Sequence, residues 1–265
     1  MGIDLRLRDK VAVITGGSRG LGAANARLMA AEGAKLSLVA LADPELERFA
    51  AELRDSHGAE VLVIPTDLTD PKAADDAAAR SLAAYGRIDV LINSAGAAQG
   101  GIFWDIPDEV WDEAYTLKFM GTVRMMRAVL PAMRERKYGR IVTVVGDTGK
   151  QPRARLLPGA SVNAALLAVT KGLADEVAAD GISVNAVNPG PTRTERVTTL
   201  FANLARDTGR SLEDIEKDFT EDSPFGTIGE PDEVARMIVL LASDAASNIT
   251  GSSITTDGGR SRALA

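Results

Sequence analysis

The chain has 265 residues, 45% of them hydrophobic and 25% charged, which is typical of a globular protein with a substantial core. Its formal net charge of −7 argues against the basic face on which nucleic-acid binding depends, so we expect no nucleic-acid partner. Cysteine is absent and His57 is the only histidine, which rules out disulfides, thiolate nucleophiles and multi-histidine sites, and we expect no metal.

The sequence has no recognisable secretory signal and no uncharged apolar run of about 18 residues. We therefore expect no membrane partner, and the lack of cysteine fits a cytoplasmic location. A length of 265 residues suits one α/β domain, and neither an internal repeat nor a linker is evident. We expect residues 1–265 to form a single domain.

Short β-branched runs alternate with helical stretches along the first half of the chain. The predicted strands there are Val11–Thr15, Lys35–Ala40, Val61–Pro65 and Asp89–Asn93. A helix over Leu21–Glu32 is expected to end at Gly33, and a second over Pro44–His57 begins after Asp43, a suitable N-cap. An Ala-rich stretch supplies a helix between the third and fourth strands.

The second half continues this alternation. Its predicted elements are a long helix over Val110–Lys137, a strand over Arg140–Val145, a helix over Asn163–Ala179, a strand over Ser183–Val187, a helix over Pro231–Ser243 and a strand over Ser253–Thr256. Alternation of this kind is typical of a parallel sheet with crossover helices. We predict an α/β fold, a Rossmann-type doubly wound parallel sheet of about seven strands with helices on both faces.

A polar segment over residues 192–225 interrupts the pattern before the last helix. Within it Val197, Leu200, Phe201 and Leu204 recur at helical spacing, which predicts a short amphipathic helix. Loops past the carboxyl end of a sheet commonly carry substrate specificity. We therefore expect residues 192–225 to form a substrate lid over a partly hydrophobic pocket.

A glycine-rich turn follows the first strand and opens the first helix, with glycines at Gly16, Gly17, Gly20 and Gly22. Glycine permits positive φ and lets the backbone approach a phosphate, while the amino end of a helix offers free N–H groups to an anion. Such a string also occurs in strand–helix connections that bind nothing. Its place between a β-branched strand and a helix favours a dinucleotide site.

Five motifs, in chain order, resemble those of the short-chain dehydrogenase/reductase family. TGGSRGLG at 15–22 resembles the family's TGxxxGxG turn, and Asp67 resembles its adenine-contacting Asp. The segments NSAG at 93–96, NPGPT at 188–192 and TDGG at 256–259 resemble its NNAG, its Pro-Gly turn with the carboxamide-binding Thr, and its C-terminal signature. The cofactor-binding residues implied by the resemblance are Gly16, Ser18, Arg19, Gly20, Leu21, Gly22, Asp67, Leu68, Asn93, Ala95, Gly96, Pro189, Gly190 and Thr192.

The resemblance implies an NAD(P)-dependent oxidoreductase that acts on a carbonyl or alcohol group of a small molecule, in a homotetramer or dimer. The second strand ends in Leu38-Val39-Ala40-Leu41-Ala42, without an acidic side chain to hold the ribose hydroxyls and repel a 2′-phosphate. Helix capping accounts for Asp43. Arg19 carries the charge to pair with a 2′-phosphate, although a solvated loop arginine is the alternative. We expect NADP in preference to NAD.

The family's four usual catalytic side chains are all replaced when its motifs are matched to this chain. Asn163 falls on the position of the family's Lys and Gly159 on that of its Tyr. Gly146 stands where the family has Ser, and Lys118 where it has Asn. The chain's three tyrosines, Tyr85, Tyr115 and Tyr138, cannot fill the usual position without breaking the alignment. The chain resembles a divergent branch with a similar pair of helices, in which a Tyr stands near the position of Leu156.

A relocated catalytic set of Lys118, Asp147 and Asn163 is one hypothesis. Lys118 would project from the long helix toward the cofactor, Asn163 would replace the missing Lys at the ribose, and Asp147 would pair with Lys118 or act as a base. A surface lysine and a loop-capping aspartate are the alternatives. At the level of function, three hypotheses stay open: an atypical oxidoreductase, a catalytically lapsed NADP-binding sensor or partner subunit, and a non-redox lyase or isomerase.

Overall fold

A seven-stranded parallel sheet forms the centre of the structure, a computed structural model that describes residues 3–96 and 99–262. The strand order is β3-β2-β1-β4-β5-β6-β7, and every adjacent pair is parallel. The strands are β1 (Val11–Thr15), β2 (Lys35–Ala40), β3 (Val61–Pro65), β4 (Val90–Asn93), β5 (Gly139–Val144), β6 (Ile182–Pro189) and β7 (Ser253–Thr256). Strands β2 and β3 lie on one side of β1, and strands β4 to β7 lie on the other side. Open α/β sheets bind ligands in the crevice at such a switch point, here between β1 and β4.

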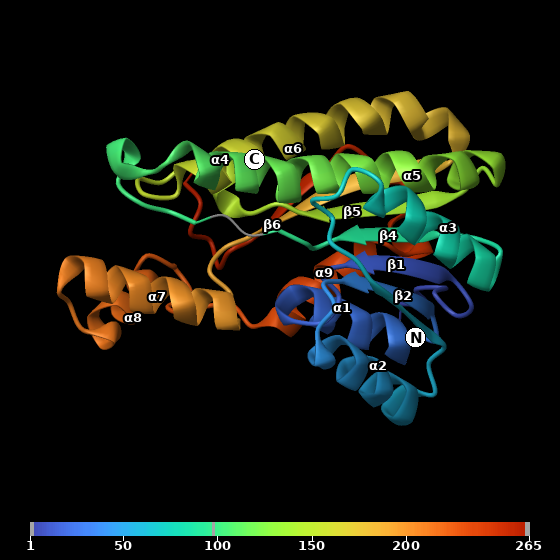
Figure 1. Cartoon of the computed structure of the whole chain (residues 1–265), viewed down its shortest axis with the longest axis horizontal. Helices are drawn as coiled ribbons and strands as arrows, with labels where there is room; N and C mark the ends of the chain where they lie inside the picture. Colours follow the sequence, from blue (N-terminus) through green and yellow to red (C-terminus); the bar gives the residue numbers. More distant parts are fainter. Residues whose placement is uncertain (1–2, 97–98, 263–265) are drawn as a thin grey trace.

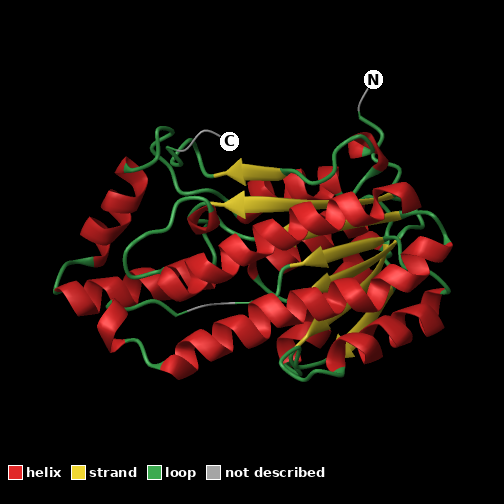
Figure 2. Ribbon diagram, turned by 90° about the horizontal axis from the view of Figure 1, so that it is seen from above, coloured by secondary structure: helices red, strands yellow, loops and turns green. Residues whose placement is uncertain are grey.

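Helices cover both faces of the sheet (Figures 1 and 2). One layer holds α1 (Gly20–Ala31), α2 (Pro44–His57) and α9 (Pro231–Leu241); the other holds α3 (Ala73–Tyr85), α4 (Asp108–Ala114), α5 (Gly121–Glu135) and α6 (Leu157–Val177). Single-turn 3-10 helices lie at Phe103–Asp105, Asp147–Gly149, Ala178–Asp180 and Asp244–Ala246. The predicted doubly wound fold is confirmed.

Alternation along the buried strands assigns side chains to the two layers. In β1, Ala12 and Ile14 join the core beneath α1, α2 and α9, whereas Val13 joins the core beneath α3 and α5. Successive side chains of a strand point to opposite faces, so a strand covered on both sides is apolar throughout. All five residues of β1 are buried. This packing makes the carboxyl end of β1 a rigid base for the turn that follows.

Two helices differ from their predicted bounds. Helix α6 begins at Leu157 and not at Asn163, because Pro158 lies in the first turn, where a missing N–H removes no helical hydrogen bond. The long predicted helix is divided: α4 and α5 are joined by a π-helical turn over Tyr115–Met120. A π turn inserts an extra residue into the helix and changes the direction of the side chains that follow, and such turns are frequent at functional sites.

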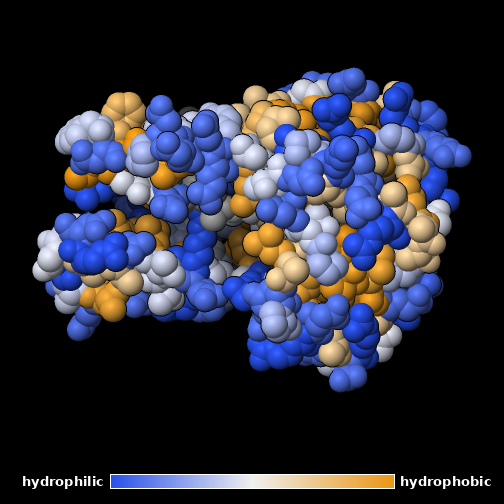
Figure 3. All heavy atoms as spheres, in the orientation of Figure 1, coloured by the Kyte–Doolittle hydropathy of each residue, from blue (hydrophilic) through white to orange (hydrophobic). Residues whose placement is uncertain are grey.

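Residues 192–225 contain two helices, α7 (Glu195–Thr208) and α8 (Leu212–Glu221). They project beyond the carboxyl edge of the sheet, toward which all the strand arrows point (Figure 2). The apolar face of α7 packs mainly against α8, with the rings of Phe201 and Phe219 4.7 Å apart beside buried Ile215 and Ile228. Figure 3 shows a slot between this arm and the layer that holds α4.

No helix in the described part of the chain is long and apolar enough to cross a membrane.

Candidate functional site

The turn after β1 has the geometry of a phosphate cradle. Gly16 and Gly20 adopt φ of +62° and +52°, values that side-chain-bearing residues rarely take. Arg19 is the extended N-cap of α1, but its side chain caps no backbone N–H, and the first turn of α1 holds no acidic residue. The first amides of α1 are therefore left to an external acceptor, as a bound phosphate requires.

The turns after β1 and β4 lie against each other at the switch point. The hydroxyl of Thr15 accepts hydrogen bonds from the backbone N–H groups of Ser94 (3.0 Å) and Ala95 (3.1 Å). A Cβ atom at Gly16 would lie 3.0 Å from the backbone of Ala95. Glycine at 16 therefore allows the two turns to approach, and together they form one wall of the crevice.

The start of α1 also packs closely on this turn. A Cβ atom at Gly22 would lie 2.0 Å from the carbonyl oxygen of Gly16, so only glycine fits there. Ser18, Arg19 and Gly20 line a cavity of about 730 Å³ that extends to the starts of α7 and α9. Leu21, between Gly20 and Gly22, is partly buried. The structure thus brings the predicted residues of the turn together at one end of the crevice.

Three further predicted cofactor residues lie at the ends of β3 and β4. One carboxylate oxygen of Asp67 accepts hydrogen bonds from the backbone N–H (2.9 Å) and the hydroxyl (2.8 Å) of Thr69, which orients the exposed carboxylate. Leu68 is buried. Asn93 is also buried, and its Oδ1 has no hydrogen-bond partner among the described residues. Such an orphaned acceptor fits a site in which a bound polar group completes the hydrogen bonding.

The last predicted cofactor residues follow β6. Pro189 ends this strand, and the N–H of Gly190 donates to the carbonyl of Thr256 at 3.1 Å. A Cβ atom at Gly190 would lie 2.8 Å from Cβ of Asp257, so glycine is required at this close approach. The buried hydroxyl of Thr192 donates to the Gly190 carbonyl at 3.0 Å. Residues 188–192 and 256–259 therefore meet at the same edge of the sheet.

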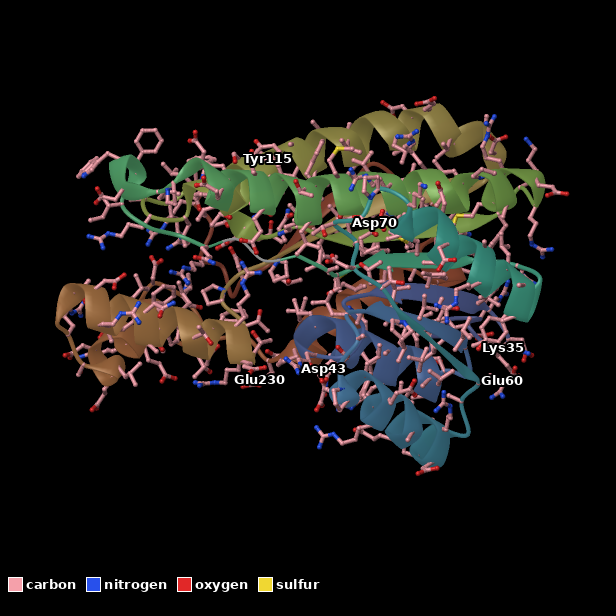
Figure 4. All side chains as sticks on the ribbon, viewed as in Figure 1. Lys35, Asp43, Glu60, Asp70, Tyr115 and Glu230 are labelled. Atoms are coloured by element: carbon pink, nitrogen blue, oxygen red, sulfur yellow. The ribbon has the colours of Figure 1, made fainter. Side chains whose placement is uncertain are left out.

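Arg19 is paired with Asp43 at the end of β2. The distance between Arg19 Nη2 and Asp43 Oδ2 is 2.5 Å. The other oxygen of Asp43 accepts from the N–H of Glu45 at 2.8 Å, which confirms the predicted cap of α2. Asp43 and Glu230 lie near the middle of the view in Figure 4, whereas Lys35 and Glu60, which form an ion pair, lie at its right side.

Lys118 lies in the π-helical turn and reaches across to β5 and α6. Its ammonium donates to the carbonyl oxygen of Val145, just past β5, and to Oδ1 of Asn163 in α6, both at 2.6 Å. Both acceptors are uncharged. Lys118 and Asn163, which were expected to replace the family's Asn and Lys, are therefore in direct contact at the carboxyl edge of the sheet.

The space around Asn163 is shaped to its side chain. Its Nδ2 donates to the hydroxyl of Thr148 at 2.9 Å, which leaves Oδ1 facing Lys118. A Cβ atom at Gly146 would lie 2.8 Å from Nδ2 of Asn163, and one at Gly149 would lie 2.9 Å from its Cβ. The glycine at 146, where the resemblance leads one to expect Ser, thus makes room for the amide.

Burial gives Lys118 an unusual acidity. Desolvation, followed by the nearby charge of Arg196, lowers the pKa of Lys118 from 10.5 to about 7. Arg196, in the first turn of α7, donates from Nη1 to the carbonyl of Gly96 at 3.0 Å. Gly96 itself packs against Lys118, since a Cβ atom there would lie 2.7 Å from Cβ of the lysine. The start of α7, the β4 turn and Lys118 are therefore in contact.

Asp147 lies at the same edge but does not pair with Lys118 in the described structure. Both hydrogen bonds of the Lys118 ammonium go to Val145 and Asn163. Asp147 is buried, which raises the pKa of its carboxyl group, and the charges of Arg153 and Arg260 partly offset this effect. The expectation that Asp147 pairs with Lys118 is therefore wrong, because Asp147 stands in the 3-10 turn after β5 while the ammonium bonds Val145 and Asn163. The alternative role of Asp147 as a base stays a prediction.

The three tyrosine hydroxyls have no contact with this lysine. Tyr85 donates to the carbonyl of Leu36 at 3.2 Å, and Tyr138 donates to Asp244 at 2.9 Å. Tyr115, labelled in Figure 4, is 37% exposed and its ring lies 6.0 Å from that of Phe119. Tyrosine therefore supplies no hydrogen bond to Lys118 or Asn163 in the described structure.

Three parts of this arrangement left no clear signal in the sequence. The Val145 carbonyl is a backbone group, so its role as an acceptor leaves no residue-specific signal. Arg196 is only one of several charges in residues 192–225, and its proximity to Lys118 depends on where α7 lies. Thr148 directly follows Asp147, yet its bond to Asn163 became visible only with α6 in place.

Comparisons with known proteins agree with this architecture. A family model described as "Enoyl-(Acyl carrier protein) reductase" matches residues 16–261. The chain is 35% identical to an acetoacetyl-CoA reductase of Rhizobium meliloti (strain 1021) over 253 residues, which cover 95% of this chain and 98% of the relative. Among solved structures, L-sorbose reductase from Gluconobacter frateurii, complexed with NADPH and L-sorbose, is similar with a TM-score of 0.93 and 32% identity, covering 99% of this chain and all of that one. A short-chain type dehydrogenase/reductase from Mycobacterium ulcerans gives a TM-score of 0.88 at 26% identity, with 96% and 90% coverage.

Proposed function

The chain belongs to the short-chain dehydrogenase/reductase family of NAD(P)-dependent oxidoreductases, and on this premise we propose that it reduces a small-molecule carbonyl with Lys118 as the proton donor. The observation that carries the proposal is the Lys118 ammonium, held by Val145 and Asn163 beside the β4 turn. We propose that the chain belongs to a divergent branch of the family in which the catalytic groups are relocated.

The residues of the crevice fit a dinucleotide. The uncapped amides of Gly20, Leu21 and Gly22 suit the pyrophosphate, and the oriented carboxylate of Asp67 suits an adenine amino group. The orphaned Oδ1 of Asn93 offers a further acceptor. Bound in this crevice, a reduced nicotinamide would supply the hydride. We propose NADP in preference to NAD because the side chain of Arg19, in the turn after β1, reaches Asp43 just past the end of β2, where a 2′-phosphate would lie.

The ammonium of Lys118 has three N–H donors, and two are used by Val145 and Asn163. The third is the one we assign to the substrate carbonyl oxygen. As the carbonyl carbon gains the hydride, this N–H proton moves to the oxygen, and the neutral amine regains a proton from solvent. A pKa of about 7 keeps a large fraction of the lysine protonated at neutral pH and makes its proton easy to transfer.

The fit around Asn163 supports a retained site over a lapsed one. Loss of function alone would not be expected to leave Gly146 and Gly149 shaped to the Asn163 amide, or Thr148 bonded to it. Asn163 is then a positioning residue for Lys118.

We propose that Asp147, whose carboxyl group holds a proton to higher pH than a surface aspartate, hydrogen-bonds the substrate. Residues 192–225 would act as the lid, since Arg196 at their start already contacts the β4 turn.

The test begins with fluorescence titration of the purified chain with NADPH and NADH. Loss of NADPH absorbance is then followed with a carbonyl panel that includes acetoacetyl-CoA and L-sorbose, compounds that the names of the relatives indicate. Lys118→Met should bind NADPH but lose turnover by about 10²- to 10⁴-fold, the usual contribution of a positioned acid. Lys171→Met serves as the control, because Lys171 is exposed and pairs with Asp175 one turn away.

Each outcome discriminates between hypotheses. Turnover retained in Lys118→Met would reject the lysine as proton donor. NADPH binding without turnover on any carbonyl would favour a nucleotide-binding protein without redox activity. Absence of binding by either nucleotide would reject the cofactor assignment.

A further inference from the structure

The nitrogen of Lys118 is held by uncharged oxygens only. Its two hydrogen bonds end on the Val145 carbonyl and the Asn163 amide, and no ion pair among residues 3–96 and 99–262 includes this lysine. A tetrahedral amine that donates two N–H bonds has one remaining direction. In the charged form that direction carries the third proton, and in the neutral form it carries the lone pair. The residue as a whole is partly exposed, although its amine is desolvated.

We propose that Lys118 is also a nucleophile that captures small aldehydes and ketones as imines. The two fixed acceptors hold the nitrogen at the carboxyl edge of the sheet and orient its third position. A desolvated lysine near a second cation is a known arrangement for activating an amine toward a carbonyl carbon. Imine formation at Lys118 needs neither hydride transfer nor a bound nucleotide, and can therefore occur whether or not the protein reduces carbonyls.

The charges around Lys118 favour its neutral form. From α7, Arg196 repels the ammonium, and desolvation adds the larger effect. From the turn after β5, Asp147 interacts with Arg153, Arg260 and Asp257 and makes no hydrogen bond to Lys118. With a pKa of about 7, about half of the Lys118 amines are neutral at pH 7. An ordinary surface lysine of pKa about 10.4 is neutral in only about one molecule in 2,500.

The chemistry balances without a co-reactant. The amine lone pair attacks the carbonyl carbon and forms a C–N bond, while the π electron pair moves to the oxygen. That oxygen takes one proton from the nitrogen and a second from solvent, and water leaves. The product is a protonated imine between the carbonyl carbon and the lysine nitrogen, which water can hydrolyse back to the starting pair.

The experiment traps the imine on the full chain at pH 7, without nucleotide, using propanal and sodium cyanoborohydride as reductant. Peptide mass spectrometry then measures the alkylation rate of Lys118 against Lys171 and Lys217, both exposed and each paired with an acid one turn away. Lys118 should react at least about tenfold faster than either. Its rate should rise with pH to about 7 and then level off, whereas the two surface lysines continue to gain.

A lid variant tests the electrostatic part of the proposal. Arg196→Gln removes the repelling charge, so Lys118 should be alkylated several-fold more slowly at pH 6.5. Arg206→Gln is the matched control, because Arg206 lies on the same helix and its side chain is 73% exposed next to Asp207. This variant should leave the alkylation rate of Lys118 unchanged.

Formaldehyde replaces propanal in a second series, because it is the smallest aldehyde and excludes poor access as an explanation. If Lys118 reacts no faster than Lys171 and Lys217 with both aldehydes, the proposal is overturned. Trapping without any NADPH oxidation would support capture and contradict the proposed reduction. NADPH oxidation without trapping would support the proposed reduction and contradict the capture of carbonyls by Lys118.

Discussion

At the scale of single residues, the lowered pKa of Lys118 makes the free energy of unfolding depend on pH, and the residue that we propose as proton donor also lowers stability at neutral pH. Its folded pKa of about 7 lies below the value near 10.5 expected for the unfolded chain. Between these two values the unfolded state binds the extra proton, so the stability of the wild type rises with pH over this window. Below pH 7 the folded protein must carry a desolvated ammonium, and that part of its stability is lost.

We therefore expect Lys118→Met to be more stable than the wild type at pH 7, by about 1 to 3 kcal/mol, although it lacks the proposed proton donor. The difference should fall by up to about 1.4 kcal/mol for each pH unit above 7, so that the wild type becomes the more stable protein before pH 10. Urea denaturation of both proteins at pH 7, 8 and 9 measures it, with Lys171→Met as the control. A constant difference across this range would show that the lysine does not titrate there.

Arg19 and Asp43 make opposite contributions to cofactor choice. Their ion pair places a cation and an anion together at the end of β2, so only the cation can favour a 2′-phosphate. Arg19→Ala should weaken NADPH binding by about tenfold or more, the loss expected for a charge-assisted hydrogen bond, and leave NADH affinity nearly unchanged. Asp43→Asn keeps the cap of α2 but releases Arg19, and should strengthen NADPH binding.

Fluorescence titration of both variants with each nucleotide tests this pair. An equal loss of NADPH and NADH affinity in Arg19→Ala would mean that Arg19 contacts the part that the two cofactors share. Stronger NADH binding in Asp43→Asn would likewise contradict the assignment.

At the scale of elements, α1 carries an unusual polar residue in its core-facing side. Asn25 is fully buried, and neither its Oδ1 nor its Nδ2 has a partner among the described residues. The surrounding face of α1 consists of small apolar residues and Met29. An amide buried without hydrogen bonds costs about 1 to 3 kcal/mol, judged from mutational data.

Asn25→Leu keeps a branched shape and removes both polar atoms, so we expect the free energy of unfolding to rise by about 1 to 3 kcal/mol. Chemical denaturation at fixed pH measures the change, and an unaltered m-value would show that compactness is preserved. A loss of stability would indicate either overpacking or a buried water on the amide, and Asn25→Ala distinguishes these because it relieves only the overpacking.

Most helices and strands could be predicted from the local sequence, but the start of α6 and the π turn before α5 could not. The strands and α2 follow from β-branched runs, from Asp43 as cap and from Pro44 in the first turn. Leu157–Val162 were missed as helix, because Pro158 and Gly159 read locally as breakers although proline is tolerated in a first turn. The π turn over Tyr115–Met120 has no periodic signature, and in the structure both this turn and α4 pack against α6.

At the scale of the whole molecule, the α7–α8 arm is tied to the body at both ends. Arg196 contacts the β4 turn at the start of α7. Asp222, just past α8, accepts from Arg153 (2.7 Å) and from buried Arg260 (2.8 Å), and the bond from Arg153 chiefly lowers the pKa of the Asp222 carboxyl. This tie is therefore present at neutral pH and is lost as the pH falls through that lowered pKa.

Asp222→Asn should loosen the arm without disturbing the sheet, because it removes the charge that both arginines share. Hydrogen–deuterium exchange should speed up in α7 and α8 and stay unchanged in β1 and β4. Glu213→Gln, an exposed change in the first turn of α8, is the control. Unchanged protection of α7 and α8 in Asp222→Asn would contradict the role of this ion pair in holding the arm.

The sequence by itself determined the alternation of strands and helices, the phosphate turn and the order of the family motifs, because these depend on neighbours within about one turn of chain. Tertiary structure alone decided what Lys118 touches. Its partners Val145 and Asn163 are 27 and 45 residues away, and Asp147, which lies only two residues from Val145, makes no hydrogen bond to it. Burial and the approach of α7 set the acidity of the lysine, and both are properties of the packed molecule.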